Sequence, residues 1–396
     1  MKAYNSVTLF NTSIKRKAEN WFAQKLISAE QREAILNSYS TYLYTPNIFV
    51  KIGLFLFTCF IILAASSIYF LMFASGFNSS GNGFYIFTSL FFSCACFAVL
   101  ELLIKSKHVY NAGSDEALLY VGLLSLFICL FTIIGASGED NALLLACLAM
   151  PFIAFAVIRY ADRLITLALC FCVYTILFLF VLKFGDVAKM VMPFVLMFFS
   201  AMVYFQAKKI KSKTNLYYWR SCIGVIEYVT LLVFYASCNY YVIRESSVAF
   251  FNLQLATGQD IPLAFLFYIL TASIPIIYIY SGLKQKDKTL LWSGLILLAA
   301  SAITFKYYFS LGHPEISLTI AGILLIMVAY FAINYLKIPK HGITYEEEKD
   351  ANSFLRSNAE ALIILEGMRQ ESPTTSQDDF EFGGGKSGGA GSGGSY

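Results

Sequence analysis

Two acidic residues stand inside strongly apolar segments and are the first candidates for chemistry. Glu227 lies five residues after the start of the apolar stretch 222–242, and Glu101 lies near the end of the stretch 84–104. A carboxyl group is costly to bury in a membrane, so it usually pairs with a neighbouring helix or lies on an ion, proton or substrate pathway. We therefore predict a candidate intramembrane polar site at Glu227 and Glu101. The alternative is a local structural pair, or, for Glu101, a charge that reaches the lipid headgroups.

No catalytic pattern accompanies these carboxylates. The sequence holds no HExxH, no phosphate-binding loop and no nucleophile elbow, and its three histidines are scattered over predicted loops. Nearly all nine cysteines fall inside apolar stretches, where a thiol is a small apolar filler. We predict a protein that is not an enzyme and that takes no cofactor and no metal. The net charge of +4 is explained by membrane topology and requires no nucleic acid.

The elements that must position these carboxylates are long apolar helices. Of the 396 residues, 58% are hydrophobic and only 14% are charged, which is too few charges to cover a soluble protein of this length. About 20 apolar residues in a helix cross the hydrocarbon core of a bilayer. The sequence predicts about ten spans within 48–336, at 48–73, 84–104, 116–135, 142–158, 164–182, 187–205, 222–242, 261–282, 290–309 and 316–336.

Basic residues orient these spans. Of the 29 lysines and arginines, 25 fall on the two termini, on alternate connections or at the adjoining span edges. Because Lys and Arg gather on the cytoplasmic side, this alternation places both termini in the cytoplasm and requires an even number of spans. The predicted fold class is therefore all-α, a polytopic transmembrane helix bundle with short cytoplasmic helices at both ends.

The N-terminal segment 1–47 is polar enough to stay outside the bilayer and contains two helical patterns. The first covers 14–27. The second begins at Ser28, which together with Gln31 fits a capping box, and runs towards Tyr44, where Thr45-Pro46 stops it. We predict a helical hairpin that packs on itself or on the membrane domain. An amphipathic helix lying in the membrane interface is the alternative.

The residues of this segment also carry a resemblance. The run Trp21-Phe22-Ala23-Gln24-Lys25-Leu26-Ile27-Ser28-Ala29-Glu30-Gln31, followed by Ile35-Leu36 and Tyr39, resembles the opening of a bacterial family of predicted membrane proteins of unknown function. The match covers about 35 residues and the general layout, a short helix pair followed by many spans. The resemblance implies a multi-pass protein of the bacterial inner membrane. It implies no activity and no catalytic residues.

The C-terminal region divides into two parts. Segment 337–371 contains a helical pattern over 346–370, with three glutamates in its first turn, where they favour the positive helix end. Segment 372–396 is a polar linker and a Gly-rich tail, predicted to be flexible. The tail is similar to the C-termini of several bacterial membrane-associated proteins, in which a phenylalanine and a run of glycines end on an aromatic residue.

Glycines let a strand enter a narrow groove, and a terminal aromatic residue with a free carboxylate is an anchor that peptide-binding domains capture. We therefore predict that the tail docks on a partner, while an engineered linker remains the alternative. The predicted partner-binding residues are Phe380, Phe382, Gly383, Gly384, Gly385, Gly388, Gly389 and Tyr396.

Two functions fit the sequence. The first is a non-enzymatic accessory or scaffold subunit of an inner-membrane protein complex, which docks other membrane or cytoplasmic proteins through its tail. The second is a secondary transporter or flippase for a small or lipidic solute. The second rests on the ten spans, on Glu227, and on Pro193 and Pro275, which lie well inside spans and can break helices to expose backbone groups.

Overall fold

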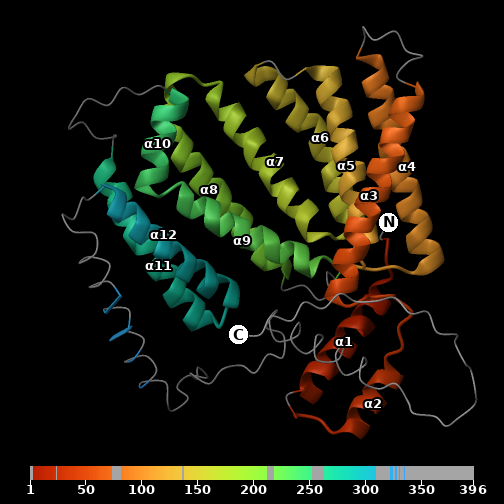
Figure 1. Ribbon diagram of the computed structural model, residues 1–396. Helices are drawn as coiled ribbons and strands as arrows, with labels where there is room; N and C mark the ends of the chain where they lie inside the picture. Colours follow the sequence, from red (N-terminus) through yellow and green to blue (C-terminus); the bar gives the residue numbers. More distant parts are fainter. Residues whose placement is uncertain are drawn as a thin grey trace, which may run out of the picture. The chain divides into compact units, whose positions relative to one another are not determined.

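The structure is a computed structural model that describes residues 3–23, 25–73, 82–135, 138–211, 218–251 and 263–308, and six single positions between 322 and 334. The chain divides into two units, 1–348 and 349–396, and every described residue belongs to the first. The described residues form helices and no strand beyond one isolated bridge (Figure 1). The helices are α1 (Ser6–Ala23), α2 (Ala29–Ser38), α3 (Ile48–Phe73), α4 (Gly83–Lys107), α5 (Ser114–Ile134), α6 (Glu139–Tyr160), α7 (Arg163–Leu182), α8 (Asp186–Lys211), α9 (Arg220–Ala236), α10 (Tyr240–Phe251), α11 (Ala264–Gln285) and α12 (Lys288–Tyr308).

Seven of these helices are long and apolar enough to cross a membrane, and the bent pair α9 and α10 counts as an eighth if it forms one span. The seven are α3 to α8 and α11. Their positions match seven of the predicted spans, and α3 has the predicted bounds of 48–73. The apolar part of α12, Lys288–Thr304, is shorter than a full span, and most of the predicted span 316–336 lies outside the described residues.

The surface of these helices is apolar where it is exposed. No residue in the apolar core of α3 is buried, and Leu71 and Phe60 leave 77% and 69% of their surface uncovered. Soluble proteins rarely expose a continuous apolar surface of this size, whereas helices in a bilayer satisfy their backbone internally and present such side chains to lipid. The fold is therefore that of a multi-pass membrane protein.

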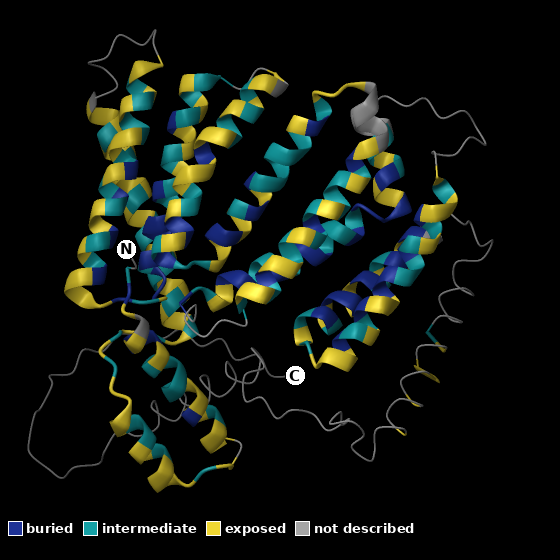
Figure 2. Cartoon of the chain, turned by 180° about the vertical axis from the view of Figure 1, so that it is seen from behind, coloured by how far each residue is buried: buried dark blue, intermediate teal, exposed yellow. Residues whose placement is uncertain are grey.

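Successive helices pack as neighbouring pairs, namely α4 with α5, α6 with α7, α8 with α9 and α11 with α12. Small residues allow the closest approaches: a Cβ added at Gly282 in α11 would lie 2.7 Å from the backbone nitrogen of Leu291 in α12. Figure 2 shows buried residues gathered around the N-terminal end of the chain. There Leu100 of α4, Leu119 of α5 and Tyr160 of α6 form the largest buried cluster with Tyr4.

The N-terminal helix pair is present, with bounds that differ from those predicted. The capping box at Ser28 and Gln31 is confirmed, and Arg32 of α2 binds Glu19 of α1 at 2.8 Å. However, α1 begins at Ser6, where the side chain of Asn5 accepts the backbone N–H of Val7.

Helix α2 ends at Ser38 instead of running towards Tyr44. After Ser38 the chain leaves the helix and runs along α1, which supplies polar partners for it. The side chain of Asn11 donates to the Ser40 carbonyl, and the hydroxyls of Thr12 and Thr41 are 3.1 Å apart. The two helices thus pack on each other, as the hairpin prediction required.

The seventh predicted span is broken. Helices α9 and α10 meet at 70° across residues 237–239, whereas Pro193 and Pro275 stay inside the continuous helices α8 and α11. The break is therefore at Asn239 and not at a proline. The Asn239 amide donates to Tyr235 and to Thr304 of α12, both at 3.0 Å, so polar partners on two helices hold the interrupted backbone in place.

Candidate functional site

The ends of α4, α5, α6 and α7 that face residues 3–4 carry a dense polar network, which we call the polar end. It forms where α6 stops and its last carbonyl groups lack helical partners. The Ile158 carbonyl accepts the indole N–H of Trp219, and the Arg159 carbonyl accepts the Ala3 N–H at 2.9 Å and the Tyr218 hydroxyl. The N-terminal residues and residues 218–219 are therefore bound to the same helix end.

Asp115 organises the turn that leads into α5. It is 5% exposed, and its carboxylate accepts the backbone N–H groups of Asn111 at 2.8 Å and Ala112 at 3.0 Å. The Tyr4 hydroxyl lies 3.4 Å from the same carboxylate. Burial, together with the negative charge of Asp115, raises the pKa of Tyr4 far above its usual value, so Tyr4 keeps its proton and donates it.

The same turn is joined to α3. Gly113 has φ of +95°, and a Cβ at this position would lie 2.1 Å from the Lys51 carbonyl oxygen. The Lys51 ammonium in turn lies 2.6 Å from both Asn111 Oδ1 and Glu116 Oε1. Backbone and side chain of Lys51 together therefore fix the α4–α5 loop against α3.

Glu101 is one of the two carboxylates that the sequence singled out. Both of its oxygens are 2.6 Å from the Arg159 guanidinium, and Oε1 also accepts the Tyr160 hydroxyl at 2.7 Å. The carboxylate therefore faces α6. A bidentate pair with an added tyrosine leaves little capacity for a ligand, so Glu101 joins α4 to α6.

A polar cavity of about 540 Å³ opens between these groups. Its charged lining consists of Lys51, Asp115, Glu116, Asp162, Arg16 and Arg163. Each of its carboxylates already has a partner: Glu116 has Lys51, Asp115 has the loop amides, and Asp162 accepts the Ile165 N–H at 2.9 Å and the Tyr120 hydroxyl at 3.1 Å. The cavity is therefore an ionic chamber whose carboxylates are all hydrogen-bonded, and Glu116 is the one among them that forms an ion pair among the described residues.

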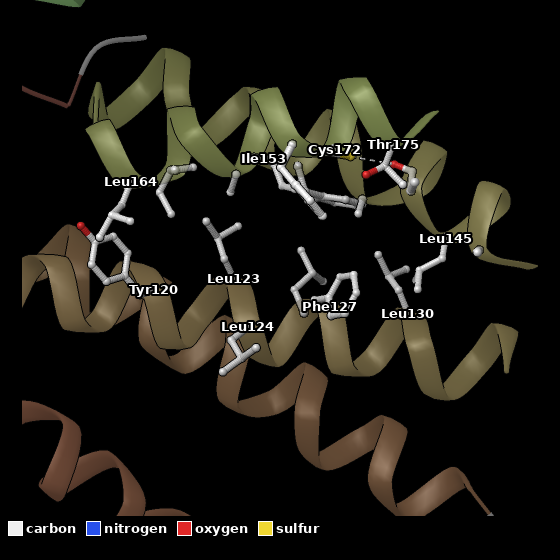
Figure 3. A pocket seen from close by; sticks show the side chains of 18 residues that line it. Tyr120, Leu123, Leu124, Phe127, Leu130, Leu145, Ile153, Leu164, Cys172 and Thr175 are labelled. Carbon is white, nitrogen blue, oxygen red and sulfur yellow. Dashed lines mark hydrogen bonds between the residues drawn. The ribbon is translucent and has the colours of Figure 1, made fainter. Parts of the chain in front are cut away.

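An apolar groove of about 640 Å³ runs from this chamber along α5, α6 and α7 (Figure 3). Leu123, Phe127 and Leu130 line it from α5, while Ile153 comes from α6 and Cys172 from α7. Nearly all of the lining surface is carbon. The groove has the shape and chemistry to hold a hydrocarbon chain, which offers no polar group to a site.

The groove and the polar cavity adjoin. Tyr120 and Leu164 line both spaces, and Figure 3 shows these two side chains next to each other at one end of the groove. The ring of Tyr120 belongs to the groove, and its hydroxyl binds Asp162 in the polar chamber. The arrangement can accept an amphipathic molecule, with its tail among leucines and its headgroup among charges.

Glu227, the second carboxylate predicted from the sequence, lies elsewhere. It is 2% exposed on α9 and accepts the ammonium of Lys211 at the end of α8. It is not among the residues that line the polar cavity or the groove, and the structure does not bring it together with Glu101. Its contacts are those of a structural ion pair between α8 and α9.

The substitution Glu227→Gln is therefore expected to lower stability without lowering ligand binding. Lys211 would lose a charged acceptor, which costs on the order of 1–3 kcal/mol. Thermal unfolding in detergent should show the loss, and Glu33→Gln on the exposed face of α2 is the matched control. Loss of bound lipid from the folded variant would instead place Glu227 in the ligand site.

The predicted docking residues Phe380, Phe382, Gly383, Gly384, Gly385, Gly388, Gly389 and Tyr396 all lie outside the described residues. Within the described part of the chain, no group of three or more His, Cys, Asp or Glu side chains is placed to hold a metal ion. The site residues that sequence reasoning missed are Tyr120, Asp162 and Arg163. Asp162 and Arg163 stood in a charged turn between two predicted spans, which the topology had already explained, whereas Tyr120 was one aromatic residue among many in an apolar span.

Comparisons of the chain with protein-family models, with curated proteins and with solved structures found no match. The helices and the site define a multi-pass α-helical membrane protein with an amphipathic pocket at one end of its bundle.

Proposed function

We propose that this protein binds a lipid-like amphiphile at the junction of the apolar groove and the polar cavity, and that it acts as a transporter or flippase for that lipidic solute. The observation that carries the proposal is the shared lining of the two spaces by Tyr120 and Leu164. A purely apolar groove accommodates any acyl chain, and a purely polar cavity accommodates any small ion. Their contact selects a molecule that has both parts.

The groove alone supplies little binding energy in a membrane. An acyl chain that leaves the bilayer for the groove exchanges one apolar surrounding for another, so the hydrophobic effect contributes little. The groove must therefore position the molecule, while ionic contacts in the polar cavity supply affinity. This division favours a charged headgroup, because hydrogen bonds to charged groups are about twice as strong as those between neutral groups.

Charge distribution supports a cytoplasmic location for the polar end. Lys51, Lys107, Arg159 and Arg163 all lie there, on the side that the charge alternation of the sequence assigns to the cytoplasm. We accordingly propose that both termini are cytoplasmic, that the chain has about ten spans, and that it resides in a bacterial inner membrane. A lipid headgroup of the inner leaflet would then lie at the depth of the polar cavity.

The transport step is tested with purified protein in vesicles that carry a fluorescent phospholipid. The protein is expected to accelerate exchange of the labelled lipid between leaflets, measured as the fraction that a membrane-impermeant quencher reaches with time. Vesicles without protein give the background rate. A rate equal to that background, from protein shown to be folded, would contradict a flippase.

A second candidate function follows from the C-terminal region. Its sequence includes the Gly-rich tail that resembles docking tails. We propose that this tail attaches the protein to a partner in an inner-membrane complex. Deleting 383–396 should release the partner in mild-detergent pull-downs, whereas deleting the polar linker 372–379 should not. Retention of the same partners without the tail would contradict docking.

A further inference from the structure

A third space adjoins the polar cavity, and we call it the basic cavity. It is an open cavity of about 900 Å³ between α1, α7, α9 and residues 218–221. It shares Arg16, Tyr110, Asn111, Arg163, Leu164 and Ser221 with the polar cavity. The two spaces therefore meet along a border that carries two arginines.

The charged residues that line the basic cavity are all positively charged. Arg16, Arg163, Arg220 and Lys211 line it, and no carboxylate among the described residues does. Glu227 neutralises Lys211, but Arg16, Arg163 and Arg220 form no ion pair with a described carboxylate. The three exposed guanidinium groups make this space basic, while Asp115, Glu116 and Asp162 line the polar cavity on the other side of the border.

The remaining lining separates into two kinds of surface. Ser221 and Tyr228 contribute hydroxyl groups, and the Ser221 oxygen lies 3.4 Å from the Arg163 guanidinium. The hydroxyls of Thr12 and Ser13 also line the cavity, but they donate to the carbonyls of Thr8 and Phe10. Leu167 of α7 and Val225, Val229 and Leu232 of α9 form an apolar wall. Guanidinium and hydroxyl donors together match the oxygens of a phosphate group.

We propose that the basic cavity binds the phosphate of an anionic phospholipid, with Arg16, Arg163 and Arg220 as its ligands. This inference rests on the proposed function, because it names the headgroup of the amphiphile whose tail lies in the apolar groove. Basic pockets between membrane helices on the cytoplasmic side are suited to anionic headgroups. The inference predicts selectivity: a headgroup with net negative charge binds, and a zwitterionic headgroup, whose ammonium meets the arginines, binds more weakly.

The test uses the full-length protein in detergent with phosphatidylglycerol, phosphatidylcholine and inorganic phosphate as separate probes. The double variant Arg163→Gln, Arg220→Gln should bind phosphatidylglycerol at least tenfold more weakly, since each lost charge-assisted bond is worth about a factor of ten. Its affinity for phosphatidylcholine should fall less, because the choline ammonium already opposes the contact between that lipid's phosphate and the arginines. The control is Lys17→Gln, because Lys17 is exposed on the same helix as Arg16 and does not line the cavity.

Salt dependence provides a measurement on the unaltered protein. Raising the ionic strength should weaken the binding of phosphatidylglycerol more than that of phosphatidylcholine, because salt screens the attraction between the arginines and an anionic headgroup, while for a zwitterion it also screens the opposing repulsion. Three results would overturn the inference. The double variant could keep its affinity for phosphatidylglycerol, or it could lose the same factor of affinity for both lipids. Inorganic phosphate could also bind the unaltered protein as tightly as phosphatidylglycerol does. The last result would assign the cavity to free phosphate.

Failure of the inference is distinguishable from failure of the proposed function. A substitution that fills the apolar groove removes the tail site and should lower the binding of both lipids. If the groove-filling substitution lowers lipid binding and the arginine variant does not, the result supports the amphiphile site and contradicts the headgroup assignment. If filling the groove has no effect, the proposed function itself fails.

Discussion

Replacing Ala168 with tryptophan should deplete the lipid that co-purifies with the protein by severalfold. Ala168 is exposed on α7 and lines the apolar groove opposite α5. An indole at this position occupies the space where the acyl chain would lie. Because the alanine side chain is not buried in the core, the larger residue fills the groove without forcing the helices apart, which would otherwise destabilise the fold.

The matched control is Ala65→Trp, which places the same side chain on an exposed position of α3, a helix that contributes no residue to the groove. Lipid is extracted from each purified variant and quantified per mole of protein. The control should retain the bound lipid of the unaltered chain. Equal depletion in both variants would mean that tryptophan perturbs the bundle in general, and no depletion in either would mean that the groove holds no ligand.

Replacing Gly113 with alanine is expected to destabilise the protein by on the order of 2–5 kcal/mol. Two costs add at this position. The φ of +95° is disfavoured for a residue with a Cβ, and the added atom would meet the Lys51 carbonyl oxygen at 2.1 Å. Relief requires the loop to move from α3, which would also remove the Lys51 ammonium from Asn111 and Glu116.

Thermal unfolding in detergent measures this loss, and Gly53→Ala is the control. Gly53 is exposed within α3 and has open space where its Cβ would lie, so alanine should be neutral or slightly stabilising there. The two variants make the same chemical change on neighbouring parts of the fold. A Gly113→Ala protein as stable as the control would show that the α4–α5 loop does not approach α3 as closely as the structure places it.

Much of the fold was predictable because the spans have a strong local signal. Apolar runs located seven candidate spans, and one hydroxyl and one amide at the correct spacing identified the capping box of α2. The break at Asn239 was not predictable in the same way. Its cause is a set of partners on other helices, including Thr304, which is 65 residues distant in sequence.

The candidate site was predictable only in part. Glu101 and Glu227 stood out as charges in apolar runs, but their partners Arg159 and Lys211 had already been explained as topological charge. The groove had no signal at all, because Leu123 and Phe127 are the same residue types that face lipid elsewhere. Only the packing of α5, α6 and α7 distinguishes a lined groove from an outer surface.

The most direct measurement is photo-crosslinking with a phospholipid that carries a diazirine on its acyl chain, followed by mapping of the modified residues by mass spectrometry. If the protein holds an amphiphile as proposed, adducts should concentrate on α5, α6 and α7, at residues such as Leu123, Phe127 and Ile153. An unlabelled phospholipid in excess should displace them. Adducts spread evenly over the exposed faces of α3 and α11 would contradict the site, because that pattern marks lipid that merely surrounds the protein.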